Sequence, residues 1–495
     1  MFDKVKKKIF KSDGIESAER LAPMGSTPNK KHLYASRQNF GVNFGSVFVL
    51  EKFMYDSLFI NDTTVELDAV RANIKQSGED ATREKLERHW NDYCSDSDWE
   101  WLKSKGVQSI RLPFGYWIVA GGDFTKGTSF ETVKDVYKNA WNILKVKYIE
   151  KAAQYNISIL LDLHAVPCGA NTGDHSGERL TKANFWTDKS AQDKAIEICG
   201  FIAKEFNGVE NIAGIQVVNE AEFCNDVKSR VKYYTKAINS IRMNNKFVPI
   251  VISDGWWADQ WCKALYDIAP GGEIWKMGVV VDEHVYRCFS DDDKRKNADQ
   301  IIRDLDGSFL NGLSRSVDFI IGEYSCVLDG QTWDKTQGNK DDFVRLYGNE
   351  LSRLIRDRAS GSYFWSYKFQ WGDGGEWGFQ PMVNRGCIPS RSIEIQLPTE
   401  NDFNQILEQA YTNHSNYWNA QNPNESYEHW RFKEGFTTAW SDCMEFAKFE
   451  NSRIGRKSAW MAARQEEHIQ ARGASGFGWQ WEHGWNEACH WWCQN

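Results

Sequence analysis

Two carboxylic acids, Glu220 and Glu323, each follow a short apolar run, in Gln216-Val-Val-Asn-Glu220 and Asp318-Phe-Ile-Ile-Gly-Glu323. Hydrolysis of a glycosidic bond requires at least two facing carboxyl groups. The protonated one assists the departing oxygen, and the ionised one attacks the sugar or activates water. We therefore take Glu220 and Glu323 as the candidate catalytic pair.

Further polar or aromatic side chains end or follow other apolar runs of the chain. Taken singly, such residues often cap helices or form hydrogen bonds within a core. Helix capping alone does not explain why so many of these residues occur together with two acids. Their joint occurrence indicates a site that binds a sugar. The candidate substrate-binding residues are Arg111, His164, Asn219, His284, Tyr286 and Trp365.

The apolar runs that precede these residues have the character of strands buried on both faces, and stretches with helical spacing, such as residues 188–205 and 227–243, separate them. This alternation predicts an α/β fold, a (β/α)8 TIM barrel, with its active site at the carboxyl ends of the strands. The predicted strands are residues 40–46, 107–113, 157–164, 213–219, 248–253, 277–284, 317–323 and 362–367.

The 495 residues exceed the needs of one barrel, and the composition changes near residue 395. We predict an N-terminal segment (1–35), the barrel (36–390) and an aromatic-rich helical C-terminal extension (391–495). The extension contains a weak repeat, Phe432-Lys-Glu-Gly-Phe-Thr-Thr-Ala439 and Trp481-Glu-His-Gly-Trp-Asn-Glu-Ala488. Its spacing places an apolar stripe on a helix, which would pack on the barrel or on another subunit, or bind a ligand.

The composition excludes several classes of protein. A net charge of −8 argues against a nucleic-acid partner. The 11 cysteines show no paired metal-binding spacing, and the closest approach, Cys489 and Cys493, lacks a second ligand pair. No glycine-rich phosphate loop follows a strand. We therefore expect no metal and no cofactor.

Several motifs together resemble glycoside hydrolase family 5, and specifically its fungal exo-β-1,3-glucanase branch. The resemblance runs in order over roughly residues 38 to 380. The motifs are Gly41-Val-Asn-Phe-Gly-Ser-Val-Phe-Val-Leu-Glu51, Arg111-Leu-Pro-Phe-Gly-Tyr-Trp117, Asp162-Leu-His164, Val218-Asn-Glu220, Glu283-His-Val-Tyr286, Gly322-Glu-Tyr324 and Phe364-Trp-Ser-Tyr-Lys368.

This resemblance implies a retaining exo-acting β-glycosidase, a β-glucosidase or glucan 1,3-β-glucosidase-like enzyme. It implies Glu220 as acid/base and Glu323 as nucleophile, with Asn219 on the sugar 2-hydroxyl. Arg111 and Tyr286 would lie beside the nucleophile. The remaining candidates would line the cleavage subsite: His164, His284 and, as its stacking platform, Trp365.

The chain departs from that branch in places, with Gly45-Ser-Val47 where the branch reads Gly-Gly-Trp, and it shows no signal peptide. We therefore expect a cytoplasmic enzyme whose substrate is a small or lipid-linked β-glycoside rather than wall glucan. The lysine-rich residues 4–11 suggest weak contact with a membrane surface, with a solvated terminus as the alternative. The extension is a candidate surface for homo-oligomerisation.

Two alternatives stay open at this point. One is a catalytically inactive carbohydrate-binding or scaffold protein on the same barrel, although loss of activity would be expected to remove carboxylates and spare stacking tryptophans. The other is transglycosylation, which uses the same covalent intermediate as hydrolysis.

Overall fold

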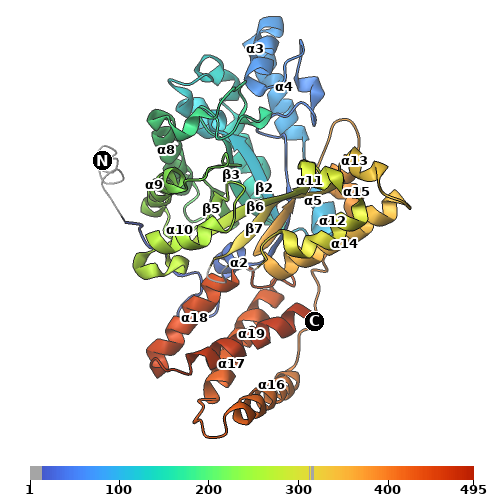
Figure 1. Ribbon diagram of the computed structural model, residues 1–495. Helices are drawn as coiled ribbons and strands as arrows, with labels where there is room; N and C mark the ends of the chain where they lie inside the picture. The colour runs from blue at the N-terminus through green and yellow to red at the C-terminus, as the bar shows by residue number, and fades with distance from the viewer. Residues whose placement is uncertain (1–13, 312, 314–316, 495) are drawn as a thin grey trace. The chain divides into compact units, whose positions relative to one another are not determined.

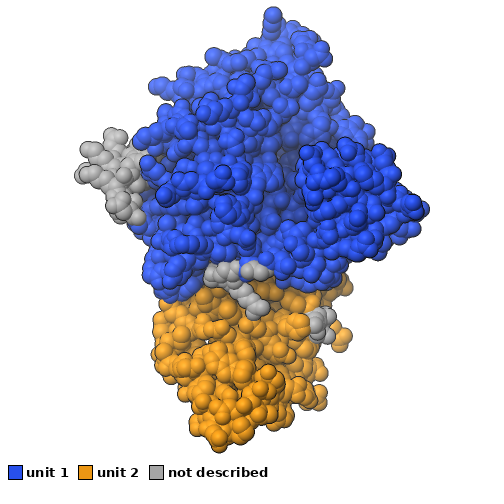
Figure 2. Space-filling model, in the orientation of Figure 1, with its two compact units in different colours: residues 1–19, 39–391 blue, residues 20–38, 392–495 orange. Residues whose placement is uncertain are grey.

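The computed structural model describes residues 14–311, 313 and 317–494, and the chain divides into two compact units (Figure 2). Unit 1 contains the described part of residues 1–19 together with residues 39–391. Unit 2 contains residues 20–38 and the described part of 392–495. The basic residues 4–11, for which weak membrane-surface contact and a solvated terminus are the alternatives predicted from the sequence, lie outside the described residues.

In the described part of unit 1, eight parallel strands close into a barrel in chain order, and β8 pairs back to β1 (Figure 1). All eight predicted strands are present, so the predicted barrel is confirmed. The strands are β1 Asn39–Asn43, β2 Ser109–Gly115, β3 Ser158–Ala165, β4 Ile212–Gln216, β5 Ile250–Ser253, β6 Val279–Arg287, β7 Phe319–Leu328 and β8 Gly361–Phe364.

Helices separate the strands, and both helices predicted by residue range are present, as α8 and α9. The Asp188 side chain caps α8 by accepting hydrogen bonds from the N–H groups of Ser190 and Ala191. The α-helices in the described part of unit 1 are α3 Glu66–Ser77, α4 Glu79–Asp92, α5 Asp96–Ser104, α6 Ala140–Ile143, α7 Lys151–Gln154, α8 Lys189–Glu205, α9 Lys228–Asn244, α10 Gln260–Ile268, α11 Asp291–Arg295, α12 Ala298–Ser308, α13 Gly330–Asp334, α14 Lys340–Arg358 and α15 Phe379–Asn384.

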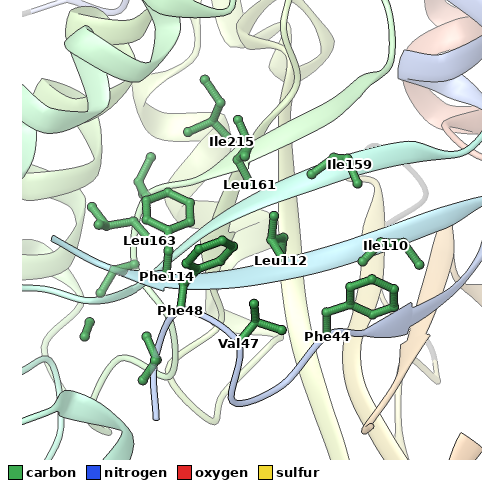
Figure 3. Close-up of a cluster of buried hydrophobic side chains, with 14 of the residues drawn as sticks. Phe44, Val47, Phe48, Ile110, Leu112, Phe114, Ile159, Leu161, Leu163 and Ile215 are labelled. Carbon is green, nitrogen blue, oxygen red and sulfur yellow. The ribbon is translucent and has the colours of Figure 1, made fainter. Parts of the chain in front are cut away.

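Strand alternation sorts the barrel side chains into two layers, because successive residues point to opposite faces of a strand. Alternate residues of β2 and β3, such as Leu112 and Leu161, join the main apolar core (Figure 3). Val47, which stands where the resembled branch has tryptophan, is fully buried in the same cluster. The intervening residues, such as Arg111 and Asp162, belong to the opposite face, where the polar site is built.

Unit 2 is helical, as predicted for the C-terminal extension, and its helices are α2 Lys30–Ser36, α16 Glu400–Gln421, α17 Trp430–Lys448, α18 Lys457–Arg472 and α19 Gly478–Gln494. A buried ion pair joins α17 to α18: the Arg464 guanidinium donates to both carboxylate oxygens of Asp442, at 2.7 and 2.8 Å. The indole of Trp460 donates to the same carboxylate at 2.8 Å. The two helices are thereby fixed to each other in their buried face.

The two copies of the weak repeat pack against each other within unit 2. A Cβ atom added to Gly435 of α17 would lie 2.0 Å from the carbonyl oxygen of Trp481, and one added to Gly484 of α19 would lie 2.0 Å from that of Phe432. The repeated glycines thus permit close contact between the two backbones. The predicted apolar stripe is present. Within unit 2 it packs against the second copy of the stripe, a partner that was not among those predicted from the sequence.

Within the described residues, no helix is both long enough and apolar enough to cross a membrane.

Candidate functional site

Glu220 and Glu323 meet at the carboxyl end of the barrel, with a carboxylate oxygen of one within 4.8 Å of a carboxylate oxygen of the other. Glu323 belongs to β7 and is 5% exposed. Glu220 lies four residues beyond the end of β4 with a φ of 41°. This left-handed conformation costs about 1–3 kcal/mol in a non-glycine residue, and such strain is concentrated at functional sites. Asn171 holds it by donating to the Glu220 carbonyl at 2.9 Å.

Arg111 of β2 is the buried hub of the site. Its Nη1 donates to Oε1 of Glu323 at 2.9 Å, and its Nη2 donates to Oδ1 of Asn219 at 2.7 Å. The same Nη2 lies 3.0 Å from Oδ2 of Asp162, and Nε donates to Gln216 at 3.0 Å. A fully buried guanidinium needs such anionic and polar partners, and in return it holds several strand ends in one arrangement.

His284 of β6 lies between the two acids. Its Nδ1 is 2.9 Å from Oε1 of Glu220 and 3.5 Å from Oε2 of Glu323, while Nε2 is 3.2 Å from Oδ2 of Asp282. Tyr286, two residues further along β6, donates its hydroxyl to Oε2 of Glu323 at 2.8 Å. Both oxygens of Glu323 therefore have donors, one in Arg111 and one in Tyr286.

The remaining predicted residues complete one connected network. His164 of β3 places Nδ1 2.6 Å from Oδ2 of Asp162 and Nε2 3.3 Å from Nδ2 of Asn219. Its ring stacks on Trp365, with centroids 6.0 Å apart and an interplanar angle of 13°. The structure thus brings all eight residues predicted from the sequence into one site.

The electrostatics of the site favour a proton on His284. Burial opposes this charge, but the carboxylates of Glu323 and Asp282 outweigh burial and raise the pKa of His284 well above 6.5. Burial also raises the pKa of Glu323, against the effects of His284 and Arg111. For Glu220, burial is outweighed by the hydrogen bond and charge of His284, which lower its pKa to about 2. In the free site the charge of His284 therefore favours the ionised form of Glu220.

Two residues near the pair were not singled out from the sequence. Glu51, in the loop after β1, is buried, and its pKa is raised by burial and by the charges of Glu323 and Glu220. His175, in the loop after β3, has Nε2 3.5 Å from Oε2 of Glu220. His175 does not follow an apolar run. Glu51 follows the apolar run Val47-Phe-Val-Leu50 outside the predicted strands, and it closes one of the motifs that carry the family resemblance.

Exposed aromatic side chains lie on loops beyond the strand ends. Trp256 is 51% exposed and contacts the His284 ring edge-on at 6.3 Å. Phe289, 63% exposed, packs on Tyr286 with ring centroids 5.5 Å apart. Such rings offer flat apolar faces to a ligand bound at the site.

Among the described residues, Glu220, His284 and Glu323 form a group with ligand-type atoms close enough together to bind a metal ion. The hydrogen-bond donors around these three residues disfavour metal binding. Arg111 and Tyr286 already donate to both oxygens of Glu323, and a protonated His284 cannot coordinate a cation.

Comparison with known proteins identifies the family. Residues 74–369 match the family model described as "Cellulase (glycosyl hydrolase family 5)". The chain belongs to glycosyl hydrolase family 5. The resemblance drawn from the motifs is confirmed, and the protein is a glycoside hydrolase. Residues 399–494 also match the model described as "Glucan 1,3-beta-glucosidase 3 C-terminal domain".

Relatives of this family 5 chain extend over both units. An uncharacterised glycosyl hydrolase of Saccharomyces cerevisiae is 37% identical over an alignment covering 93% of this chain and 92% of the relative. The glucan 1,3-beta-glucosidase 3 of Schizosaccharomyces pombe is 32% identical, covering 93% and 96%. The rutinosidase from Aspergillus niger, with a TM-score of 0.54 and 15% identity over 72% of this chain and 98% of its own, shares the fold.

Proposed function

We propose that this family 5 hydrolase is a retaining, exo-acting β-glucosidase. The observation that supports retention best is the spacing of the acids, since carboxylate oxygens of Glu220 and Glu323 lie within 4.8 Å. Retaining glycosidases hold their carboxyl groups about 5–5.5 Å apart, whereas inverting ones need about 6.5–9.5 Å to admit a water between the general-base carboxylate and the anomeric carbon.

In the proposed reaction, ionised Glu323 attacks the anomeric carbon while Glu220 donates a proton to the departing aglycone oxygen. In this proposal that proton passes to Glu220 Oε1 from His284 Nδ1, 2.9 Å away, and Glu220 returns a proton to His284 after it has taken one from water. Glu220 then accepts a proton from water, whose oxygen attacks the glycosyl–Glu323 ester and restores the Glu323 carboxylate. Arg111 and Tyr286 hold the Glu323 carboxylate in position and stabilise it when it leaves the sugar.

The proposed substrate is a small or lipid-linked β-glucoside of the cytoplasm. The name of the Schizosaccharomyces pombe relative, glucan 1,3-beta-glucosidase 3, supports glucose as the sugar. The exposed rings of Trp256 and Phe289 suit an aglycone with a flat apolar face. A homo-oligomer through unit 2 and contact of residues 4–11 with a membrane surface are further proposals that sedimentation and vesicle binding would test.

The experiment is proton NMR of the reaction with an aryl β-glucoside, which identifies the first-formed anomer before mutarotation. We expect β-glucose from the wild type, and at least a thousandfold loss of rate in Glu323→Gln. Asp334→Asn, which changes an acid in unit 1 outside the site, serves as the control with unchanged rate. α-Glucose as first product would overturn retention, and a folded wild-type protein inert toward aryl glucosides would favour the carbohydrate-binding alternative.

A further inference from the structure

Glu220 contacts a second imidazole that the proposed reaction does not use. His284 lies at Oε1, and His175 lies at the other oxygen, with Nε2 3.5 Å from Oε2. Nε2 of His175 is buried and forms no hydrogen bond in the described structure. The oxygen of Glu220 that His284 leaves available is therefore the one that His175 faces.

The loop that carries His175 is tied to the backbone of Glu220. The side chain of Asn171 donates to the Glu220 carbonyl at 2.9 Å, and its Oδ1 accepts from the Gly173 N–H at 2.8 Å. Ser176 donates its hydroxyl to the Asn171 carbonyl at 3.0 Å. One asparagine thus fixes the strained Glu220 backbone and the histidine loop together, so the approach of His175 to Oε2 is built into the fold.

The His175 ring is suited to a carboxyl group that is protonated in one step and ionised in the next. Burial, together with the neighbouring His164 and His284, lowers the pKa of His175 to about 4 against the attraction of Glu220 and Asp162. His175 is therefore neutral near pH 7. A neutral imidazole accepts a hydrogen bond from a carboxylic acid and, as the other tautomer, donates one to a carboxylate.

We propose that His175 is a positioning residue for the acid/base Glu220, orienting its Oε2 toward the glycosidic oxygen and then toward the attacking water. The inference rests on the proposed function, because it requires Glu220 to act as acid/base. His175 itself gains and loses no proton in the net reaction. The titratable groups that face His175 are Glu220, His164, His284 and Asp162, and a variant at position 175 retains all four side chains.

The test compares substrates that differ in their need for acid. In His175→Ala, kcat/KM for an alkyl β-glucoside, whose poor leaving group needs a proton, should fall about tenfold or more. For 2,4-dinitrophenyl β-glucoside, which departs without one, kcat/KM should change less than about threefold, because acid catalysis contributes about 10²–10⁴-fold only where a proton is needed. Thr172→Ala, which trims an exposed side chain of the same loop, should change neither value.

Azide separates positioning from a structural effect. Azide attacks the glycosyl–Glu323 ester without base assistance, so it should raise kcat of His175→Ala with the dinitrophenyl glucoside and yield β-glucosyl azide. His175→Gln, which keeps a polar group toward Oε2, should retain more alkyl glucosidase activity than His175→Ala. If His175→Ala fails to fold, His175→Gln is used in its place for the same measurements.

Equal loss on both substrates in a folded variant, or no loss on either, would overturn the role of His175. Glu220→Ala is measured in parallel. If Glu220→Ala shows the leaving-group dependence and azide rescue while the His175 variants do not, only this inference fails. If Glu220→Ala lacks both, the acid/base assignment in the proposed function fails as well.

Discussion

The Tyr286 hydroxyl donates a 2.8 Å hydrogen bond to Oε2 of Glu323. Glu323 is buried and Tyr286 is partly buried, and the bond reaches the oxygen that Arg111 does not hold. A donor in this place stabilises the carboxylate when it is released from the sugar, and it fixes the direction in which the other oxygen approaches the anomeric carbon.

Replacing Tyr286 with phenylalanine should therefore lower kcat/KM for an aryl glucoside by roughly 10- to 100-fold. A hydrogen bond to a charged group contributes about 1.5–3 kcal/mol, and 1.4 kcal/mol corresponds to a factor of ten. The phenylalanine ring keeps the apolar contacts with Phe289 and Trp377, so the fold should persist. Steady-state kinetics with a thermal melt measures both, and a variant within twofold of the wild type would show that this donor is dispensable.

His284→Asn should shift the acid limb of the pH–rate profile to higher pH. Loss of the imidazolium removes an interaction that lowers the pKa of Glu220 and of Glu323, so both values rise. The acid limb of the kcat/KM profile should move to higher pH by about one pH unit or more. His490→Gln, a substitution on the exposed surface of α19, is the matched control and should leave the profile unchanged.

The same substitution should change the pH dependence of stability. The folded-state pKa of His284 is raised above 6.5, so its stabilising contribution is complete below about pH 6.5 and is lost as pH rises through the raised value. The melting temperature of the wild type should exceed that of His284→Asn most at acidic pH, and the gap should narrow on the alkaline side. A gap that widens with rising pH would contradict the assigned charge.

Gly435→Ala should destabilise unit 2. The new methyl group would lie 2.0 Å from the Trp481 carbonyl oxygen, so α17 and α19 must separate. Overpacking of this kind costs about 1–3 kcal/mol, against about 1 kcal/mol gained in helix propensity. Near-UV circular dichroism of the tryptophans during thermal unfolding measures the effect. Gly476→Ala, where nothing lies within 4 Å, is the control, and equal stability of the two variants would refute close helix contact.

The sequence predicted the barrel and the principal site because both depend on regular patterns. Buried parallel strands are apolar runs, and polar residues near or just beyond the end of such a run, for example His164 and Asn219, lie at the carboxyl ends of the strands where the site forms. Alternation then decides which side chains share a face. These features are local and can be read without tertiary information.

Other features of the site and of unit 2 depend on tertiary contacts, which the periodicity of apolar residues in the sequence does not predict. His175 lies in an irregular loop, and its contact with Glu220 depends on hydrogen bonds to Asn171 across distant segments. The repeat around Gly435 and Gly484 predicted an apolar stripe but not its partner. The spacing of apolar residues identifies which side chains are buried, but it does not identify the surface on which they pack. The raised pKa of Glu51 likewise arises from burial and from the charges of Glu323 and Glu220, which lie far along the chain.

Covalent trapping tests the central claim most directly. The purified protein is incubated with 2,4-dinitrophenyl 2-deoxy-2-fluoro-β-glucoside, which slows hydrolysis of the glycosyl ester, and its intact mass and peptide map are then measured. We predict one added fluoroglucosyl group per chain, attached to Glu323 and absent from Glu323→Gln. An active enzyme that acquires no label, or one labelled at Glu220 or elsewhere, would contradict the proposed double displacement through Glu323.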